Sequence, residues 1–253
     1  MDRNGSTHLG FILSFVIFIM FVVFMFSAIE PFLKTEASKQ SLLDLLRFSL
    51  VDDFKVEDLV VLTISIDADD IGNNNKDCLN INRGTLSDLS DKDDLIIKDK
   101  SGNVLNYEFQ GGGNSMWIGP NMNLNEDVLL KIYHAGTLGN SQGDPGQGCE
   151  PVDDSNVILG SLVEENGQIL QSNILALKDK YELDCGETIK TELGIPEGNE
   201  FTFSFKLSTG EIIEPEICGG IIPDTSVYAT TFPVQYLDND ANYQIGFLTI
   251  KVW

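Results

Sequence analysis

The hydrophobic pattern of the chain begins with an unbroken apolar run. Residues 10–29 read GFILSFVIFIMFVVFMFSAI, with no charged side chain and apolar residues on every side of a helix. At about 1.5 Å per residue these residues form a helix of roughly 30 Å, the thickness of a lipid hydrocarbon core. The run therefore predicts a retained transmembrane helix over 10–29. A buried core helix and a removable secretory signal are the alternatives.

After Pro31 the apolar residues recur with a period near 3.6, which predicts an amphipathic helix. We expect one long helix over about 8–50. Its first half is the transmembrane helix at 10–29, which follows a short leader at 1–9, and its second half belongs to an amphipathic helical stalk at 30–53. The apolar side of the stalk either packs on the chain's own domain or forms a contact between copies. The predicted residues for helix–helix assembly are Leu42, Leu46 and Leu50.

From Val56 onward the period changes to two, which predicts strands. Alternation over 201–207 places Phe201, Phe203 and Phe205 on one face. Hairpins are predicted around 100–103, 166–167, 208–210 and 238–242, and one short helix over 188–193. The last strand buries either Leu248, Ile250 and Val252 or Phe247, Thr249 and Trp253. The sequence thus predicts an α+β protein, in which a long N-terminal helix precedes one antiparallel β-sandwich-like domain at 54–253.

The charge is distributed unevenly along the chain. The formal net charge is −23, and the charges of residues 1–50 sum to zero, so the whole excess lies in residues 51–253. So acidic a chain cannot neutralise many phosphates, which argues against nucleic acid as a partner. The simplest explanation of the charge is a solvated acidic surface on an extracellular domain.

All four cysteines lie beyond the apolar helix, and none forms a CxxC pair. This pattern predicts two disulfides in an oxidising compartment rather than a zinc site. Three connectivities are possible, and we favour Cys78–Cys149 with Cys185–Cys218.

The sequence shows no catalytic motif, and we expect no enzyme. The glycines of 111–113 lack the spacing and the lysine of a P-loop, and the only histidine beyond the N-terminus is His134. Trp117 either stacks on a sugar or covers an edge of the core.

Calcium is the one cofactor that the sequence suggests. Four aspartates crowd one loop and offer oxygen ligands: Asp67, Asp69, Asp70 and Asp77. The loop departs from the EF-hand pattern, since Ile71 and Cys78 occupy ligand positions. Aspartate also populates turns for backbone reasons alone, so both explanations remain open.

The N-terminal layout resembles that of a known family. Arg3, Asn4, Gly5 and Ser6, followed by an apolar helix, a proline, an amphipathic second half and a β domain, resemble the type IV pilin-like proteins, especially the archaeal kind with a class III signal peptide. The segments LGIPEGNEFTFSF and GFLTIKVW also look like archaeal proteins of this type. The resemblance implies cleavage between Gly5 and Ser6 and apolar helices that pack together as a filament core. Gly10 departs from it, because pilins usually carry a glutamate at that mature position.

Together these patterns predict a pilin-like structural subunit. It would be a single-pass protein of the cell membrane with its C-terminal domain outside, and its partners would be the lipid bilayer and further copies of itself. Its assembled form would be a surface filament or pseudopilus. The alternative is a monomeric single-pass surface protein that displays a β domain for binding or adhesion.

Overall fold

The computed structural model describes residues 5–56, 59–72, 76–86, 89, 92–165, 167–216 and 226–253, and within these ranges the side chains of 5–10, 26–38 and 164–165 are not described. The helices are α1 (Gly5–Asp53), α2 (Gln171–Asp184) and α3 (Glu187–Glu192). The strands before residue 120 are β1 (Lys55–Val56), β2 (Leu59–Ile66), β3 (Leu79–Asn82), β4 (Ile96–Lys98), β5 (Val104–Gln110) and β6 (Ser115–Gly119). The later strands are β7 (Val128–His134), β8 (Glu150–Pro151), β9 (Val157–Glu165), β10 (Gln168–Ile169), β11 (Phe201–Lys206), β12 (Ile212–Ile213), β13 (Tyr228–Leu237) and β14 (Tyr243–Val252).

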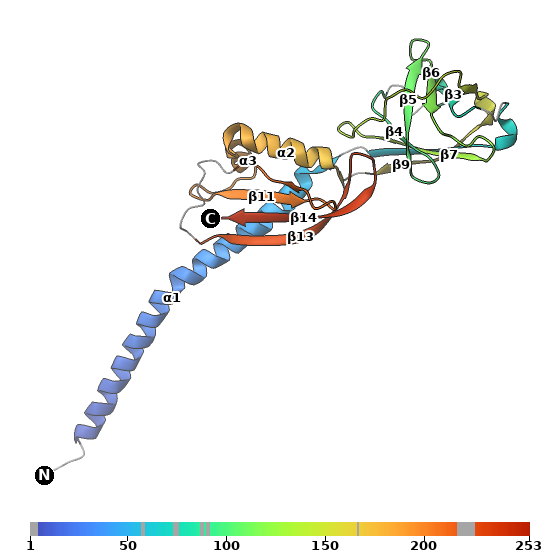
Figure 1. The fold of residues 1–253 in the computed structure, drawn as a ribbon. Helices are drawn as coiled ribbons and strands as arrows, with labels where there is room; N and C mark the ends of the chain where they lie inside the picture. Colours follow the sequence, from blue (N-terminus) through green and yellow to red (C-terminus); the bar gives the residue numbers. More distant parts are fainter. Residues whose placement is uncertain are drawn as a thin grey trace.

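These elements form two units, each with its own sheet, and α1 projects from one of them (Figure 1). The unit next to α1, here called the proximal unit, contains the four-stranded sheet β12-β11-β14-β13 with α2 and α3. The other, here called the distal unit, contains the eight-stranded sheet β8-β3-β6-β5-β4-β7-β2-β9. The distal unit is an insertion, because the chain leaves α1 for β2 and returns after β9 to α2. Both crossings meet in the short antiparallel pair β1–β10.

The proximal unit buries one face of its sheet under two helices. The second half of α1 and the apolar side of α2 share one hydrophobic core with the inward side chains of β11, β13 and β14. The predicted alternation in β11 is confirmed, since Phe201, Phe203 and Phe205 are all buried. In β14 the buried set is Leu248, Ile250 and Val252, the first of the two predicted alternatives.

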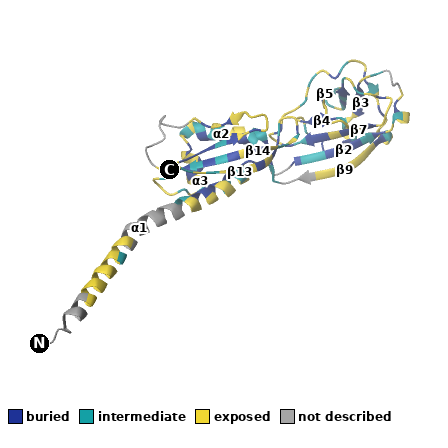
Figure 2. Ribbon diagram, turned by 60° about the horizontal axis from the view of Figure 1, so that its bottom comes forward, coloured by how far each residue is buried: buried dark blue, intermediate teal, exposed yellow. Residues whose placement is uncertain are grey.

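The distal unit has a separate core, formed by the inward side chains of β2–β7. A third, smaller cluster joins the two units, and it combines Leu59, Ile96, Tyr133, Ala135 and Leu138 with Leu170, Leu237 and Ala241. Figure 2 shows buried positions running along both sheets, while the described first half of α1 is exposed.

The fold class expected from the sequence is wrong in two respects. The chain is mixed α+β with strands dominating beyond α1, but the strands form a four-stranded and an eight-stranded sheet in two units, besides the β1–β10 pair, and not one sandwich. Nor does any helix, over the described residues, combine the length and the apolar character required to cross a bilayer. This finding contradicts the predicted transmembrane helix at 10–29 and the predicted single-pass location in a cell membrane.

Several local predictions can be compared with the observed pairing. Hairpins join β4 to β5, β11 to β12, and β13 to β14, as predicted. The hairpin predicted around 166–167 is wrong, because β9 pairs with β2 while β10 pairs with β1. Helix α2, which the sequence analysis missed, follows β10 directly, and it buries Ile174, Leu177 and Tyr181.

Candidate functional site

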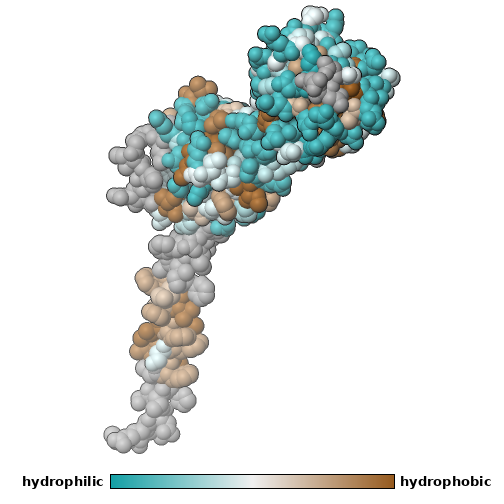
Figure 3. Space-filling model, turned by 45° about the vertical axis from the view of Figure 1, so that its right-hand side comes forward, coloured by the Kyte–Doolittle hydropathy of each residue, from teal (hydrophilic) through white to brown (hydrophobic). Residues whose placement is uncertain are grey.

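Residues 11–25 of α1 present an apolar surface that no described part of the chain covers. Among residues 11–25, every side chain except Val22 is exposed, and the large hydrophobic ones are between 42% (Met25) and 75% (Phe11) exposed. Successive residues of a helix point in directions about 100° apart, so this exposure covers all sides of the helix. Figure 3 shows the brown hydrophobic surface along the shaft and mainly hydrophilic surface over both units. We call residues 11–25 the apolar segment.

Such a surface is unusual on a folded chain. Contiguous apolar patches of more than a few hundred Å² mark interaction sites in most proteins. Covering one large apolar side chain contributes about 1.5–3 kcal/mol relative to leaving it in water. The apolar segment contains thirteen exposed side chains of this kind, so its association with another apolar surface is strongly favoured.

The second half of α1 is anchored in the proximal unit. Leu42 is 7% exposed, and Leu46 and Leu50 are fully buried in the core that α1 shares with β13 and β14. The prediction that these three leucines form contacts between copies is therefore wrong, because their apolar side already packs on the chain's own sheet. Leu45 and Phe48 lie on the other side of this part of α1, 42% and 72% exposed.

Two cationic side chains reinforce this anchorage at the surface. The guanidinium carbon of Arg47 lies 4.5 Å from the ring centroid of Phe232 in β13 and 5.9 Å from that of Phe48. Lys39 Nζ donates a hydrogen bond to Asn199 Oδ1 at 2.7 Å. The contacts of Arg47 with Phe232 and of Lys39 with Asn199 hold α1 on the proximal unit. The apolar segment of α1 points away from both units (Figure 1).

The predicted processing residues lie at the start of α1. Gly5 and Ser6 are its first two residues, and cleavage between them stays a prediction.

The four aspartates suggested for calcium do not form one chelating group. Asp67 instead caps a 3-10 turn over Ala68–Asp70, where its Oδ1 accepts a hydrogen bond from the backbone amide of Asp69 at 3.0 Å. The backbone amide of Ala68 donates to Asp127 Oδ1 at 3.1 Å. In the part of the chain that the structure describes, no group of three or more His, Cys, Asp or Glu side chains is placed to hold a metal ion. The structure thus favours the turn explanation for Asp67.

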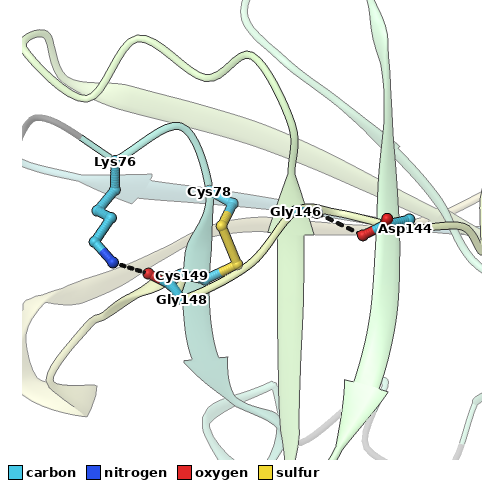
Figure 4. The surroundings of a disulfide bond; sticks show 6 residues. All are labelled: Lys76, Cys78, Asp144, Gly146, Gly148 and Cys149. Carbon is cyan, nitrogen blue, oxygen red and sulfur yellow. Dashed lines mark hydrogen bonds between the residues drawn. A yellow bond between two sulfur atoms is a disulfide. The ribbon is translucent and has the colours of Figure 1, made fainter.

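The first predicted disulfide is confirmed. Cys78 and Cys149 are bonded across a sequence separation of 71 residues, and each lies immediately before a strand, β3 and β8 respectively (Figure 4). Cys185 is also disulfide-bonded. Cys218 lies outside the described residues, so the predicted Cys185–Cys218 pairing stays a prediction.

Comparison with known proteins adds no family to this description. No model of a protein family matches the chain, and no curated protein and no solved structure shows significant similarity to it.

Proposed function

We propose that the protein is a structural, pilin-like subunit that self-associates through the apolar segment of α1. The observation that carries this proposal is the exposure of that segment on all sides of a helix whose other half is fixed in the proximal unit. Several copies that bundle these segments would cover one another's apolar surface, and van der Waals packing between helices would hold the bundle together.

The distribution of charge supports a filament-like arrangement. Residues 1–50 carry no net charge, whereas residues 51–253 carry all of the −23. The apolar segments carry no charged side chain and can pack closely, while the acidic units repel one another and favour positions on the outside. Added salt screens this repulsion, so self-association should strengthen as ionic strength rises.

In each copy the apolar segment projects from the proximal unit along α1, so contacts between these segments would leave the surfaces of both units uncovered. The alternative prediction, a monomeric surface protein that displays a β domain for binding or adhesion, differs from this proposal in its oligomeric state, although display of a binding domain is compatible with self-association.

Two isoleucines of equal exposure provide a matched test. Ile17 in the apolar segment and Ile158 in β9 are both 60% exposed. An aspartate at position 17 places a charge inside the proposed bundle, where burial of an unpaired carboxylate is costly. The same substitution at position 158 leaves the charge in water.

We expect the full-length protein to sediment as large assemblies at micromolar concentration in mild detergent. Ile17→Asp should shift it to monomers, and Ile158→Asp should leave the assemblies unchanged. A monomeric wild-type protein in sedimentation velocity would contradict the proposal. Equal dissociation by the two variants would also contradict it.

A further inference from the structure

A groove of about 890 Å³ lies on the outer face of β5 and β6 in the distal unit. Its floor includes Glu108, Gln110 and Trp117. The loop over 140–148 forms its other side, from which Asn140, Gln142, Asp144 and Gln147 line the groove.

Trp117 lies on the face of β6 opposite to the core. Its neighbours Met116 and Ile118 are both fully buried in the distal core, whereas Trp117 is half-buried. It pairs across the sheet with Glu108 in β5 and with Asn80 in β3. Directly paired residues of neighbouring strands share a face, so the indole lies between a carboxylate and an amide.

The loop that lines the groove is fixed in place at several points. The Gly143 amide donates to the Tyr107 carbonyl at 3.0 Å, and Asn106 Nδ2 donates to the Asp144 carbonyl at 3.3 Å. The Asp144 side chain accepts from the Gly146 amide at 2.9 Å, and the Cys78–Cys149 disulfide follows at the end of the loop (Figure 4).

The same loop passes very close to β6 beside the groove. A Cβ atom added at Gly119 would lie 2.6 Å from the Pro145 carbonyl oxygen and 2.5 Å from Cys78 Cβ. Only glycine permits this approach. The wall of the groove is thus preorganised, which lowers the entropic cost of binding a ligand.

The chemistry of the lining selects one class of ligand. The side-chain amides of Gln110, Gln142 and Gln147 can each donate and accept hydrogen bonds, as sugar hydroxyls do. The amide of Asn140 already donates to Asp94 Oδ1 at 3.0 Å and accepts from the Gln142 backbone amide at 3.4 Å. The indole of Trp117 offers a flat apolar surface beside these amides, which suits the C–H face of a pyranose ring. The groove residues that the structure describes include Glu108 and Asp144 but neither lysine nor arginine, so an anionic sugar would be repelled.

From this arrangement we infer that the groove binds a neutral oligosaccharide, with Trp117 as the stacking platform and the amides as hydrogen-bonding partners. The site belongs to the distal unit alone and does not depend on self-association through α1. If self-association were disproved, the proposal of oligosaccharide binding would be unaffected, and the reverse also holds.

The chain offers a control for the test, since it has two tryptophans and Trp253 lies just after β14 in the proximal unit. Isothermal titration calorimetry on the full-length protein would use three probes, the tetrasaccharides of β-1,4-linked glucose, β-1,4-linked N-acetylglucosamine and α-1,4-linked glucose. We expect saturable binding of at least one probe. Trp117→Ala should weaken it by tenfold or more, which corresponds to about 1.4 kcal/mol, and Trp253→Phe should not change it.

Glu108→Ala provides a second variant, because the side chain of Glu108 is exposed and its loss leaves the core intact. It should weaken binding of the same probe several-fold. The proposal would be overturned if none of the three tetrasaccharides bound at ligand concentrations up to about 10 mM, at which even weak binding is detected. Binding that both Trp117→Ala and Glu108→Ala leave unchanged would also overturn it. So would binding of tetramethylammonium in place of the sugars, since that would make the groove a cation site.

Discussion

Lys98 in β4 of the distal unit donates a hydrogen bond from Nζ to the backbone carbonyl of Ala241, 3.1 Å away in the β13–β14 turn of the proximal unit. The two residues are 143 positions apart in the sequence. Nζ also donates to Asn242 Oδ1 at 2.6 Å and lies 5.7 Å from the ring centroid of Tyr133. Burial lowers the pKa of Lys98, although Asp238 and Asp240 act in the opposite direction. A buried cation thus connects the two units through hydrogen bonds.

Replacing Lys98 with methionine should weaken this connection. The Ala241 carbonyl and the Asn242 side chain would lose their donor, at a cost of about 1–3 kcal/mol in the free energy of unfolding. Trp117 and Trp253 report on different units, so single-tryptophan variants can follow each unit during urea denaturation. We expect their transitions to coincide in the wild-type background and to separate in Lys98→Met. Lys131→Met, at an exposed position of the neighbouring strand β7, is the control. Transitions that still coincide in Lys98→Met would show that the hydrophobic cluster alone couples the units.

Leu45 and Leu46 are adjacent residues of α1 with opposite environments, 42% and 0% exposed. Leu46→Ala should lower the free energy of unfolding by about 2–5 kcal/mol, because it leaves a cavity in the core of the proximal unit. Leu45→Ala should change it by about 0.5 kcal/mol or less. Chemical denaturation followed through Trp253 measures both. Equal effects would be inconsistent with packing of this part of α1 on its own sheet.

The Cys78–Cys149 disulfide should stabilise the distal unit. Replacing both cysteines with serine releases a loop of 71 residues in the unfolded chain, and we expect a loss of about 2–4 kcal/mol. The loss should appear in the urea transition followed through Trp117 in a Trp253→Phe background. An unchanged Trp117 transition would show that the hydrogen bonds of the 140–148 loop suffice to hold it.

Asp184 gives the stability of the proximal unit a dependence on pH. Thr188 donates hydrogen bonds to Asp184 Oδ2 from its hydroxyl and, at 2.9 Å, from its backbone amide. These bonds hold the pKa of Asp184 below its ordinary value of 3.8. A carboxylate with a lowered pKa in the folded state stabilises the protein above its ordinary pKa, and this contribution is lost as pH falls through the folded pKa.

Asp184→Asn keeps an acceptor oxygen but removes the titrating group. The wild-type protein should therefore have the higher melting temperature at pH 7. Its advantage over Asp184→Asn should shrink as the pH falls from about 4 to about 2, near and below the ordinary aspartate pKa. Differential scanning calorimetry at these pH values measures the difference. Glu211→Gln, at an exposed position of the turn between β11 and β12, is the control. An advantage that stayed constant across this range would rule out the proposed role of the Asp184 carboxylate.

Gly119 allows the loop over 140–148 to lie against β6, and Gly136 allows a matched comparison. A Cβ at Gly119 would meet backbone and side-chain atoms within 2.6 Å, whereas one at Gly136 would meet no atom within 4 Å. Gly119→Ala should therefore displace the loop and expose its amides to hydrogen exchange, and Gly136→Ala should not. Equal exchange in the two variants would indicate that the loop can shift without cost.

The sequence by itself determined the features that depend on neighbouring residues. The alternation of Phe201, Phe203 and Phe205 fixed the buried face of β11, because side chains of a strand point to opposite sides in turn. The turn residues between β4 and β5 and between β13 and β14 likewise fixed two hairpins. The lack of charge over 10–29 identified the surface on which the proposed assembly depends.

Only the tertiary structure decided which partner each element packs against. The periodic leucines of α1 were compatible with another copy or with the chain's own sheet, and the inward faces of β13 and β14 bury them within the chain. The turn signal at 166–167 did not produce a hairpin, because β9 gains a long antiparallel pairing with β2, about one hundred residues earlier. Trp117 lies opposite Glu108 because β5 and β6 form a local antiparallel pair, whereas its position beside the 140–148 loop depends on contacts between more distant parts of the chain. Periodicity is a local property of the chain, whereas the free energy of burial depends on surfaces that the fold brings together from distant positions.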